Sequence, residues 1–196
     1  MAYSLADARF FFARAAGLAH RSLLSLRTRG LRTTWERARA QLAPPPHALR
    51  RDLFLPSPAA FERFALPTSP EPRASIVIPV YGQFAHTLAC LRALAAHPPA
   101  AAFEVIVVDD GSTDETPGRL LQVAGLRYHR RARNAGFIAA CNDGAALARG
   151  EYLVLLNNDT VPQPGWLDAL LATFDEHPGT GLAGAQLLYP DGRLQE

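Results

Sequence analysis

Several features that define large protein classes are missing from this sequence of 196 residues. No uninterrupted apolar run approaches the roughly 20 residues that a membrane-spanning helix needs. The two cysteines, Cys90 and Cys141, are too few for a disulfide framework and lack the spacing of metal ligands. Near the start, Asp7, Arg9 and Arg14 interrupt the apolar stretch that a signal peptide requires. We therefore expect a cytoplasmic protein without structural disulfides.

Two common nucleotide-binding signatures are missing as well. No G-x-x-x-x-G-K-[ST] segment occurs, which excludes a P-loop, and no G-x-G-x-x-G segment opens the first helix expected in the main domain. Lysine is also absent, and we attribute the exclusive use of Arg to coding bias rather than to chemistry. The overall composition, with 48% hydrophobic and 19% charged residues, is typical of a globular protein and excludes global disorder.

The charge is distributed unevenly along the chain. Residues 1–51 contain ten Arg and two acidic residues, a net charge of +8, whereas residues 52–196 carry a net charge of −6. Helical spacing of apolar residues predicts an Arg-rich helical segment over residues 1–42. The favoured role for this basic part, residues 1–51, is packing on the main domain or on another chain. Contact with the inner face of the cytoplasmic membrane comes second, and nucleic acid is not expected because no recognition module is present.

A Pro-rich stretch separates this segment from the main domain. Prolines fix φ and remove backbone donors, so residues 43–73 are predicted to be a linker and residues 74–196 the main domain. In that domain short apolar runs alternate with helical patterns. The expected strands are 74–80, 103–110, 126–131, 151–159 and 180–190, and the expected helices are 86–97, 115–124, 136–149 and 165–177. Continuous apolar strands and repeated strand–helix units predict a three-layer α/β/α sandwich with a mostly parallel sheet.

Polar residues follow four of the predicted strands. The segments are PVYG (79–82), VDDGS (108–112), RRARNAG (130–136) and LNNDT (156–160). Any one of them could be a helix cap or a turn, because Asp, Asn, Ser and Gly favour such positions. All four together favour a binding site, because ligands of open α/β sheets bind beyond the carboxyl ends of the strands.

The acidic residues of these segments divide into two roles. Successive side chains of a strand point to opposite faces, so Asp109 is expected to support the turn and Asp110 to face the ligand. A carboxylate accepts hydrogen bonds, so Asp110 could bind a base N–H or ribose hydroxyls. Asp159 follows an apolar strand and two amides, which makes it the better candidate ligand for a divalent cation.

Taken together, these ordered motifs resemble glycosyltransferase family 2, over about residues 74–196. The resemblance implies the GT-A nucleotide-sugar-binding fold and an inverting transfer from a nucleoside-diphosphate sugar to a glycan or lipid-linked acceptor, with Mg²⁺ or Mn²⁺ as cofactor. The stretches NAGF and LLNNDT are most similar to a bacterial branch that includes rhamnosyltransferase-like enzymes of polysaccharide assembly.

The resemblance also assigns residues by position. It implies nucleotide-sugar binding by Pro79, Tyr81, Asp109, Asp110, Asn134, Gly136 and Asn158, and metal binding by Asp159. Pro79 and Tyr81 match the segment that packs around the nucleobase, and Asp110 matches the residue that hydrogen-bonds the base. Two positions depart from the pattern: Gly82 stands where the family often has Asn, and Asn158 replaces a carboxylate, which implies weaker metal affinity.

Two other classes stay open, and the general base is not found. The segment VVDDGST resembles the aspartyl phosphatase motif, but it follows the second strand rather than the first. A non-catalytic nucleotide-sugar-binding fragment or scaffold is the stronger rival. The acids after Asp159 are Asp168, Asp175, Glu176, Asp191 and Glu196. We expect the base to lie beyond Glu196, so this C-terminally incomplete chain would bind its donor without transferring the sugar.

Overall fold

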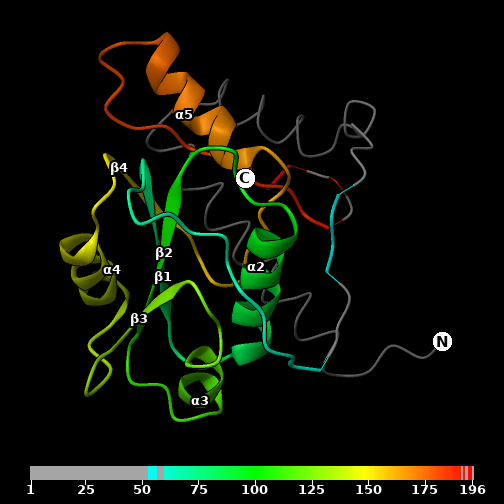
Figure 1. Ribbon diagram of the computed structural model, residues 1–196, viewed down its shortest axis with the longest axis vertical. Coiled ribbons are helices and arrows are strands. Elements are labelled where there is room, and N and C mark those ends of the chain that lie inside the picture. The colour runs from blue at the N-terminus through cyan, green and yellow to red at the C-terminus, as the bar shows by residue number, and fades with distance from the viewer. Residues whose placement is uncertain (1–52, 57–59, 191, 193, 196) are drawn as a thin grey trace, which may run out of the picture. The chain divides into compact units, whose positions relative to one another are not determined.

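The computed structural model describes residues 53–56, 60–190, 192 and 194–195 (Figure 1). The Arg-rich helical segment predicted over residues 1–42 therefore lies outside the described residues. Contacts divide the chain into Met1–Arg50 and Arg51–Glu196, and the second unit contains all of the described elements. None of the helices in the described ranges is long and apolar enough to cross a membrane.

A four-stranded parallel sheet forms the centre of the domain, in the order β3-β2-β1-β4. Its strands are β1 (Ala74–Val80), β2 (Phe103–Asp109), β3 (Leu126–Arg130) and β4 (Tyr152–Leu155). Every residue of β1 and of β2 is buried, because both strands are central and helices cover both of their faces. Because all four strands run parallel, their carboxyl ends meet at one edge of the sheet.

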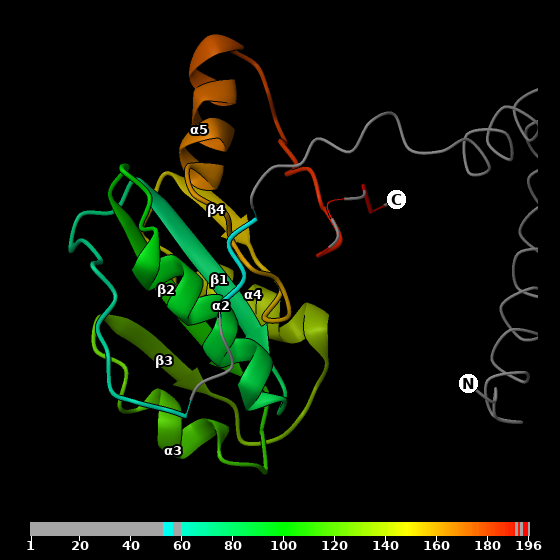
Figure 2. The same ribbon diagram turned by 90° about the vertical axis from the view of Figure 1, so that its right-hand side faces the viewer.

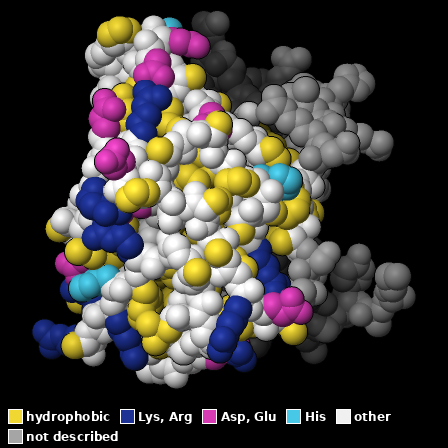
Figure 3. Space-filling model, viewed as in Figure 1, with side chains coloured by type: hydrophobic (Ala, Val, Ile, Leu, Met, Phe, Trp, Pro, Cys, Tyr) yellow, Lys and Arg dark blue, Asp and Glu magenta, His cyan; other side chains and the backbone are white. Residues whose placement is uncertain are grey.

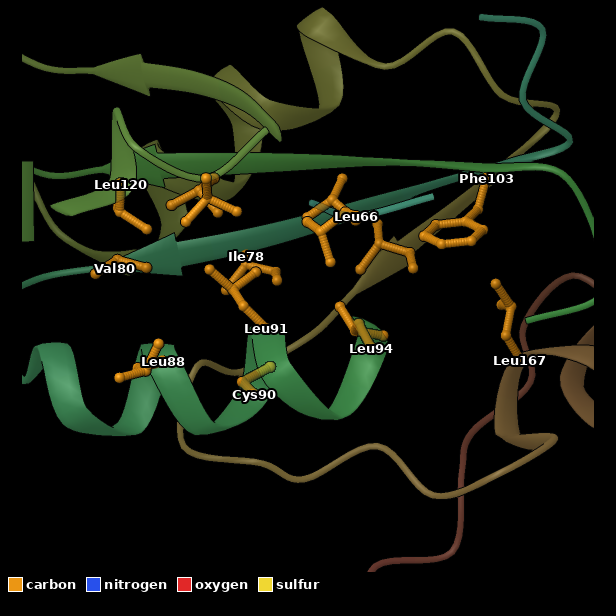
Figure 4. Packing of buried hydrophobic residues seen from close by; sticks show 14 of the residues in the cluster. Leu66, Ile78, Val80, Leu88, Cys90, Leu91, Leu94, Phe103, Leu120 and Leu167 are labelled. Carbon is orange, nitrogen blue, oxygen red and sulfur yellow. The ribbon is translucent and has the colours of Figure 1, made fainter. Parts of the chain in front are cut away.

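Helices cover both faces of this sheet, which confirms the predicted three-layer α/β/α sandwich. The helices are α2 (Phe84–Ala96), α3 (Thr116–Leu120), α4 (Phe137–Leu147) and α5 (Trp166–Glu176). In Figure 1 and Figure 2, α4 lies on one side of the sheet and α2 on the other. Figure 4 shows the larger core, in which Leu91 and Leu94 of α2 face Ile78 of β1 and Phe103 of β2.

The opposite face of the sheet is packed more tightly against α4. Val77, Ile106 and Val108 form a second apolar cluster with Ala140 of this helix. One turn further, Gly144 lies so close to the sheet that a β-carbon there would be 2.2 Å from Cγ1 of Val77. Only glycine allows α4 to approach β1 this closely.

A buried carboxylate holds the amino-terminal edge of the sheet together. Glu104 is 2% exposed, and its side chain accepts hydrogen bonds from Ser75 Oγ (2.7 Å), Arg127 Nη1 (2.6 Å) and Arg149 Nη2 (2.8 Å). Burial by itself would raise the pKa of Glu104. The bonds from Ser75, Arg127 and Arg149 outweigh that effect and lower the pKa to about 2.

Three sequence-based element predictions are wrong at their ends or entirely. The predicted helix 115–124 ends at Leu120, and the predicted strand 151–159 ends at Leu155. Residues 180–190 do not form a strand. Their only ladder contact among the described residues is an isolated antiparallel bridge between Leu188 and Leu194. A strand needs a neighbouring strand to pair with, and none pairs with this segment in the described part of the chain.

Composition predicted a linker over residues 43–73, but the described part of that stretch packs on the domain. Leu66 is 3% exposed and belongs to the larger core. Its amide donates to the carbonyl of Ala124 at 2.9 Å, and the amide of Ser69 donates to the carbonyl of Phe103 at 2.8 Å. Residues 60–73 are thus held by the domain through backbone bonds and core contacts, although their prolines prevent regular structure.

Candidate functional site

A cavity of about 330 Å³ opens where the carboxyl ends of β1, β2 and β4 meet the beginning of α4. Its lining combines apolar and aromatic side chains with a few polar ones. The lining residues are Pro79, Val80, Tyr81, Asp110, Asn134, Gly136, Phe137, Ala140 and Asn158. Six of the eight predicted site residues are therefore brought together here, from four separate segments of the chain. Asp109 and Asp159 are not among the lining residues.

Asp110 lies at the edge of this cavity and is only 4% exposed. Its carboxylate accepts hydrogen bonds from the amides of Ala135 (3.0 Å) and Gly136 (2.7 Å), and it pairs with Arg131 Nη1 at 3.2 Å. A carboxylate offers about four acceptor positions. The amide of Ala135 also contacts the second oxygen at 3.1 Å, so each oxygen already has two protein donors, and a donor on a ligand would share an oxygen with them.

Asp109 is fully buried and faces the protein, as predicted for the residue that supports the turn. Oδ1 accepts from the amide of Ser112 at 2.8 Å, and Oδ2 accepts from the hydroxyl of Tyr128 at 2.5 Å. Burial and the hydrogen bond to Asp109 raise the pKa of Tyr128 above its usual range. Asp109 thus joins the end of β2 to β3 and to the turn that follows.

Ser112 has a positioning role that the sequence reasoning missed. The sequence pattern allowed a helix cap or a turn for its segment, whereas its hydroxyl accepts a hydrogen bond from the amide of Gly82 at 2.7 Å. Its carbonyl accepts another from Arg130 Nη2 at 2.9 Å. Ser112 therefore links the turn after β2 to the segment after β1 that carries Tyr81.

The turn before α4 is shaped by Asn134 and Gly136. The side-chain oxygen of Asn134 accepts a hydrogen bond from the amide of Gly136 at 3.0 Å. Gly136 has φ +91°, a conformation that L-residues with a side chain rarely adopt. Together with the bonds to Asp110, this conformation holds the start of α4 against the cavity.

Asn158 reaches the cavity from the turn after β4. Its amide nitrogen donates to Oγ1 of the buried Thr87 on α2 at 3.0 Å, so its side-chain oxygen has no partner among the described residues. The same turn is closed by Thr160, whose hydroxyl donates to the carbonyl of Asn157 at 2.7 Å. Cys90 of α2 packs beneath it, and burial raises the pKa of this thiol to about 12.

Asp159, the predicted metal ligand, is exposed on this turn beside the cavity. Within the described ranges no group of three or more His, Cys, Asp or Glu side chains could hold a metal ion. A resident ion with an all-protein ligand set therefore does not fit these residues. One carboxylate and a nearby amide oxygen do fit an ion that takes its remaining ligands from substrate phosphates and water.

Two of the later acidic residues serve the fold at the opposite edge of the sheet. Asp168 accepts hydrogen bonds from the amides of Ala100 (3.0 Å) and Ala101 (2.9 Å), directly before β2. Asp175 pairs with Arg73, directly before β1. Figure 3 shows acidic side chains gathered toward this α5 end of the molecule. Both carboxylates thus lie at the amino ends of the strands, away from the cavity.

The parallel sheet, the helices on both faces and the cavity at the carboxyl ends of the strands place this domain among the open α/β domains that bind ligands at that edge of the sheet. The family model described as glycosyl transferase family 2 matches residues 75–196. The chain belongs to this family.

Curated relatives agree with that family. The chain is 31% identical over 134 residues to the "Glycosyltransferase AglE" of Haloferax volcanii, covering 64% of this chain and 43% of the relative. It is 34% identical over 144 residues to the "O-antigen biosynthesis protein RfbC" of Myxococcus xanthus, covering 71% of this chain and 11% of the relative. The chain thus spans less than half the length of either relative.

Solved structures include a similar chain with a bound nucleotide sugar. The Staphylococcus aureus protein TarS, residues 1–349, in complex with UDP-GlcNAc, is 25% identical to this chain. The alignment has a TM-score of 0.49 and covers 57% of this chain and 37% of that TarS chain.

Proposed function

We propose that this chain forms the donor-binding part of an inverting, metal-dependent glycosyltransferase. The observation that carries the proposal is the cavity at the carboxyl ends of the strands, where Asp110 and Asn158 present polar groups beside Pro79 and Tyr81. A nucleoside has an aromatic face and a hydrogen-bonding edge, and this lining offers a partner for each. Asp110 would accept a base N–H, and Tyr81 would pack against the base.

The metal is part of the proposal. Asp159 would bind Mg²⁺ or Mn²⁺ together with the donor diphosphate, and Asn158 would contact the ribose or the ion through its side-chain oxygen. The support is the exposed position of Asp159 beside the cavity and the free side-chain oxygen of Asn158 among the described residues. When bound, the ion would neutralise charge on the departing diphosphate.

The proposed reaction is a direct displacement at the anomeric carbon. The acceptor oxygen forms a bond to this carbon while the bond to the diphosphate oxygen breaks, and the nucleoside diphosphate leaves with the electron pair. A carboxylate base takes the acceptor proton. Asp168 and Asp175 are excluded from that role in this arrangement, because both bind backbone or Arg partners at the other edge of the sheet.

The biological setting is also a proposal. The similarity to a protein named for O-antigen biosynthesis supports a role in cell-surface polysaccharide assembly with a glycan or lipid-linked acceptor. The rhamnosyltransferase-like branch and contact of residues 1–51 with the inner membrane face rest on the sequence patterns. Salt-sensitive binding of the chain to anionic vesicles, absent after removal of residues 1–51, is the expected result for membrane contact.

The metal-dependent step is tested by nucleotide titrations with and without Mn²⁺. In the Asp159→Ala variant we expect the Mn²⁺-dependent gain in nucleoside-diphosphate affinity to disappear while the metal-independent affinity stays. The matched control is Asp168→Asn, whose carboxylate lies at the opposite sheet edge and should keep the gain. An equal gain in wild type and Asp159→Ala contradicts the metal assignment.

Transfer is tested separately from binding. The chain is incubated with nucleotide sugars, with and without an acceptor panel, and release of nucleoside diphosphate is measured. Metal-dependent release supports a transferase. Donor binding with neither release nor transfer would instead support the donor-binding fragment or scaffold.

A further inference from the structure

One aromatic side chain of the cavity has no role in the function proposed so far. Phe137, the first residue of α4, is 57% exposed and lines the same cavity as Tyr81 and Asp110. Large aromatic side chains gain stability by burial, and Phe137 forgoes most of that gain. The cavity that Phe137 lines also presents polar groups, and a ligand bound there could bury the exposed ring.

The backbone that carries Phe137 is firmly held. The two preceding amides, of Ala135 and Gly136, both donate to the buried carboxylate of Asp110. Gly136 adopts the positive φ that turns the chain into α4. The backbone that carries the ring is therefore fixed next to Asp110, the carboxylate proposed to accept a hydrogen bond from the base.

We propose that Phe137 is a ligand-contacting residue whose ring packs against the nucleobase from the α4 side, while Tyr81 contacts it from the β1 side. This inference rests on the proposed nucleotide-sugar function of the cavity. Stacking on an aromatic side chain tolerates any base, because every base has a π-face. Phe137 thus contributes affinity for the nucleoside, and the hydrogen bond to Asp110 contributes selectivity among bases.

The chain offers a matched control in the next residue. Ile138 is also on the first turn of α4 and is 76% exposed, but it does not line the cavity. Removing either side chain takes a similar apolar group from the same exposed turn. Only the removal of Phe137 should change binding.

The test measures affinities of the full chain by calorimetry for UDP, TDP, GDP, CDP and ADP, for the matching free nucleoside, and for pyrophosphate. We expect Phe137→Ala to weaken the best nucleoside diphosphate and its nucleoside by the same factor, about tenfold. Pyrophosphate binding should not change, because the ring contacts only the base. Phe137→Tyr should retain wild-type affinity, and Ile138→Ala should behave as wild type.

The possible outcomes separate this inference from the proposed function. If wild type binds none of the nucleoside diphosphates, the proposed function fails, and the inference fails with it. If wild type binds and Phe137→Ala binds equally well, only the inference is overturned. Equal losses in Phe137→Ala and Ile138→Ala, or a loss that Phe137→Tyr does not restore, would point to a change in α4 and would also overturn it. Melting temperatures of all variants show whether α4 is intact.

Discussion

Replacing Glu104 by Gln should destabilise the domain, and the size of the effect follows from the lowered pKa of the Glu104 carboxylate. The carboxylate has its pKa lowered from 4.5 to about 2 by Ser75, Arg127 and Arg149 in spite of burial. One pKa unit corresponds to about 1.4 kcal/mol, so the charged form contributes about 3 kcal/mol to the free energy of unfolding at neutral pH. Glutamine fills the same space without the charge, and we expect most of that contribution to be lost.

The direction of the pKa shift of Glu104 determines how its contribution to stability depends on pH. The folded-state pKa lies below the unfolded value, so the stabilisation is fully present above about pH 4.5 and is lost as the pH falls toward 2. Wild type and Glu104→Gln should therefore differ most near pH 7 and converge as the pH approaches 2. Urea unfolding followed by circular dichroism at several pH values measures this difference.

An exposed carboxylate provides the control. Glu115 forms an ion pair with Arg119 one helical turn away, and both side chains are largely exposed to water. Glu115→Gln should change the free energy of unfolding by less than about 0.5 kcal/mol. A Glu104→Gln variant as stable as wild type at pH 7, or a difference independent of pH, would refute the reasoning about this buried network.

Two further predictions concern packing and burial. Gly144→Ala should destabilise the domain by about 1–3 kcal/mol, because a β-carbon there would meet a side chain of β1 at 2.2 Å. Gly118→Ala, in α3 with no atom within 4 Å of the new carbon, should not, and equal urea midpoints for the two variants would contradict the close approach of α4. Cys90, whose pKa burial raises to about 12, should resist thiol reagents at pH 8 until the domain unfolds. Mass spectrometry of the labelled peptides checks this, and rapid labelling of Cys90 in the folded chain would show that the thiol is accessible.

Patterns of apolar residues were sufficient for the centre of the fold. The strand at 74–80 was predicted with its observed ends, because a run of buried β-branched residues is distinctive. Residues 180–190 are also partly apolar, but they contain two glycines and no Val or Ile, and whether such a segment pairs with the sheet depends on residues distant in the sequence. The packing of Leu66 was missed for a related reason, since its partner Ala124 is distant in the sequence.

The place of the candidate site and six of its lining residues were predictable, but Phe137 and the bonds inside the site were not. The motifs at the strand ends bring Pro79, Tyr81 and Asp110 to one cavity, because parallel strands end at the same edge. The hydrogen bonds from the amides before α4 to Asp110 depend on the path of the loop between β3 and α4, which the sequence does not specify. Phe137 looked like an ordinary helix residue, and its exposure at the cavity becomes visible only when the loop and the helix are placed together.

The most direct test of the account is whether Asp110 binds the nucleoside. Calorimetric titration of the wild-type chain and of Asp110→Asn with the five nucleoside diphosphates in Mn²⁺ answers this, with thermal unfolding to show that the variant is folded. We expect saturable binding of at least one nucleotide to wild type and at least about tenfold weaker binding to Asp110→Asn, the loss typical of a hydrogen bond to a charged group. Equal affinity in a folded Asp110→Asn variant, or no binding of any of the five nucleotides to wild type, would contradict the account.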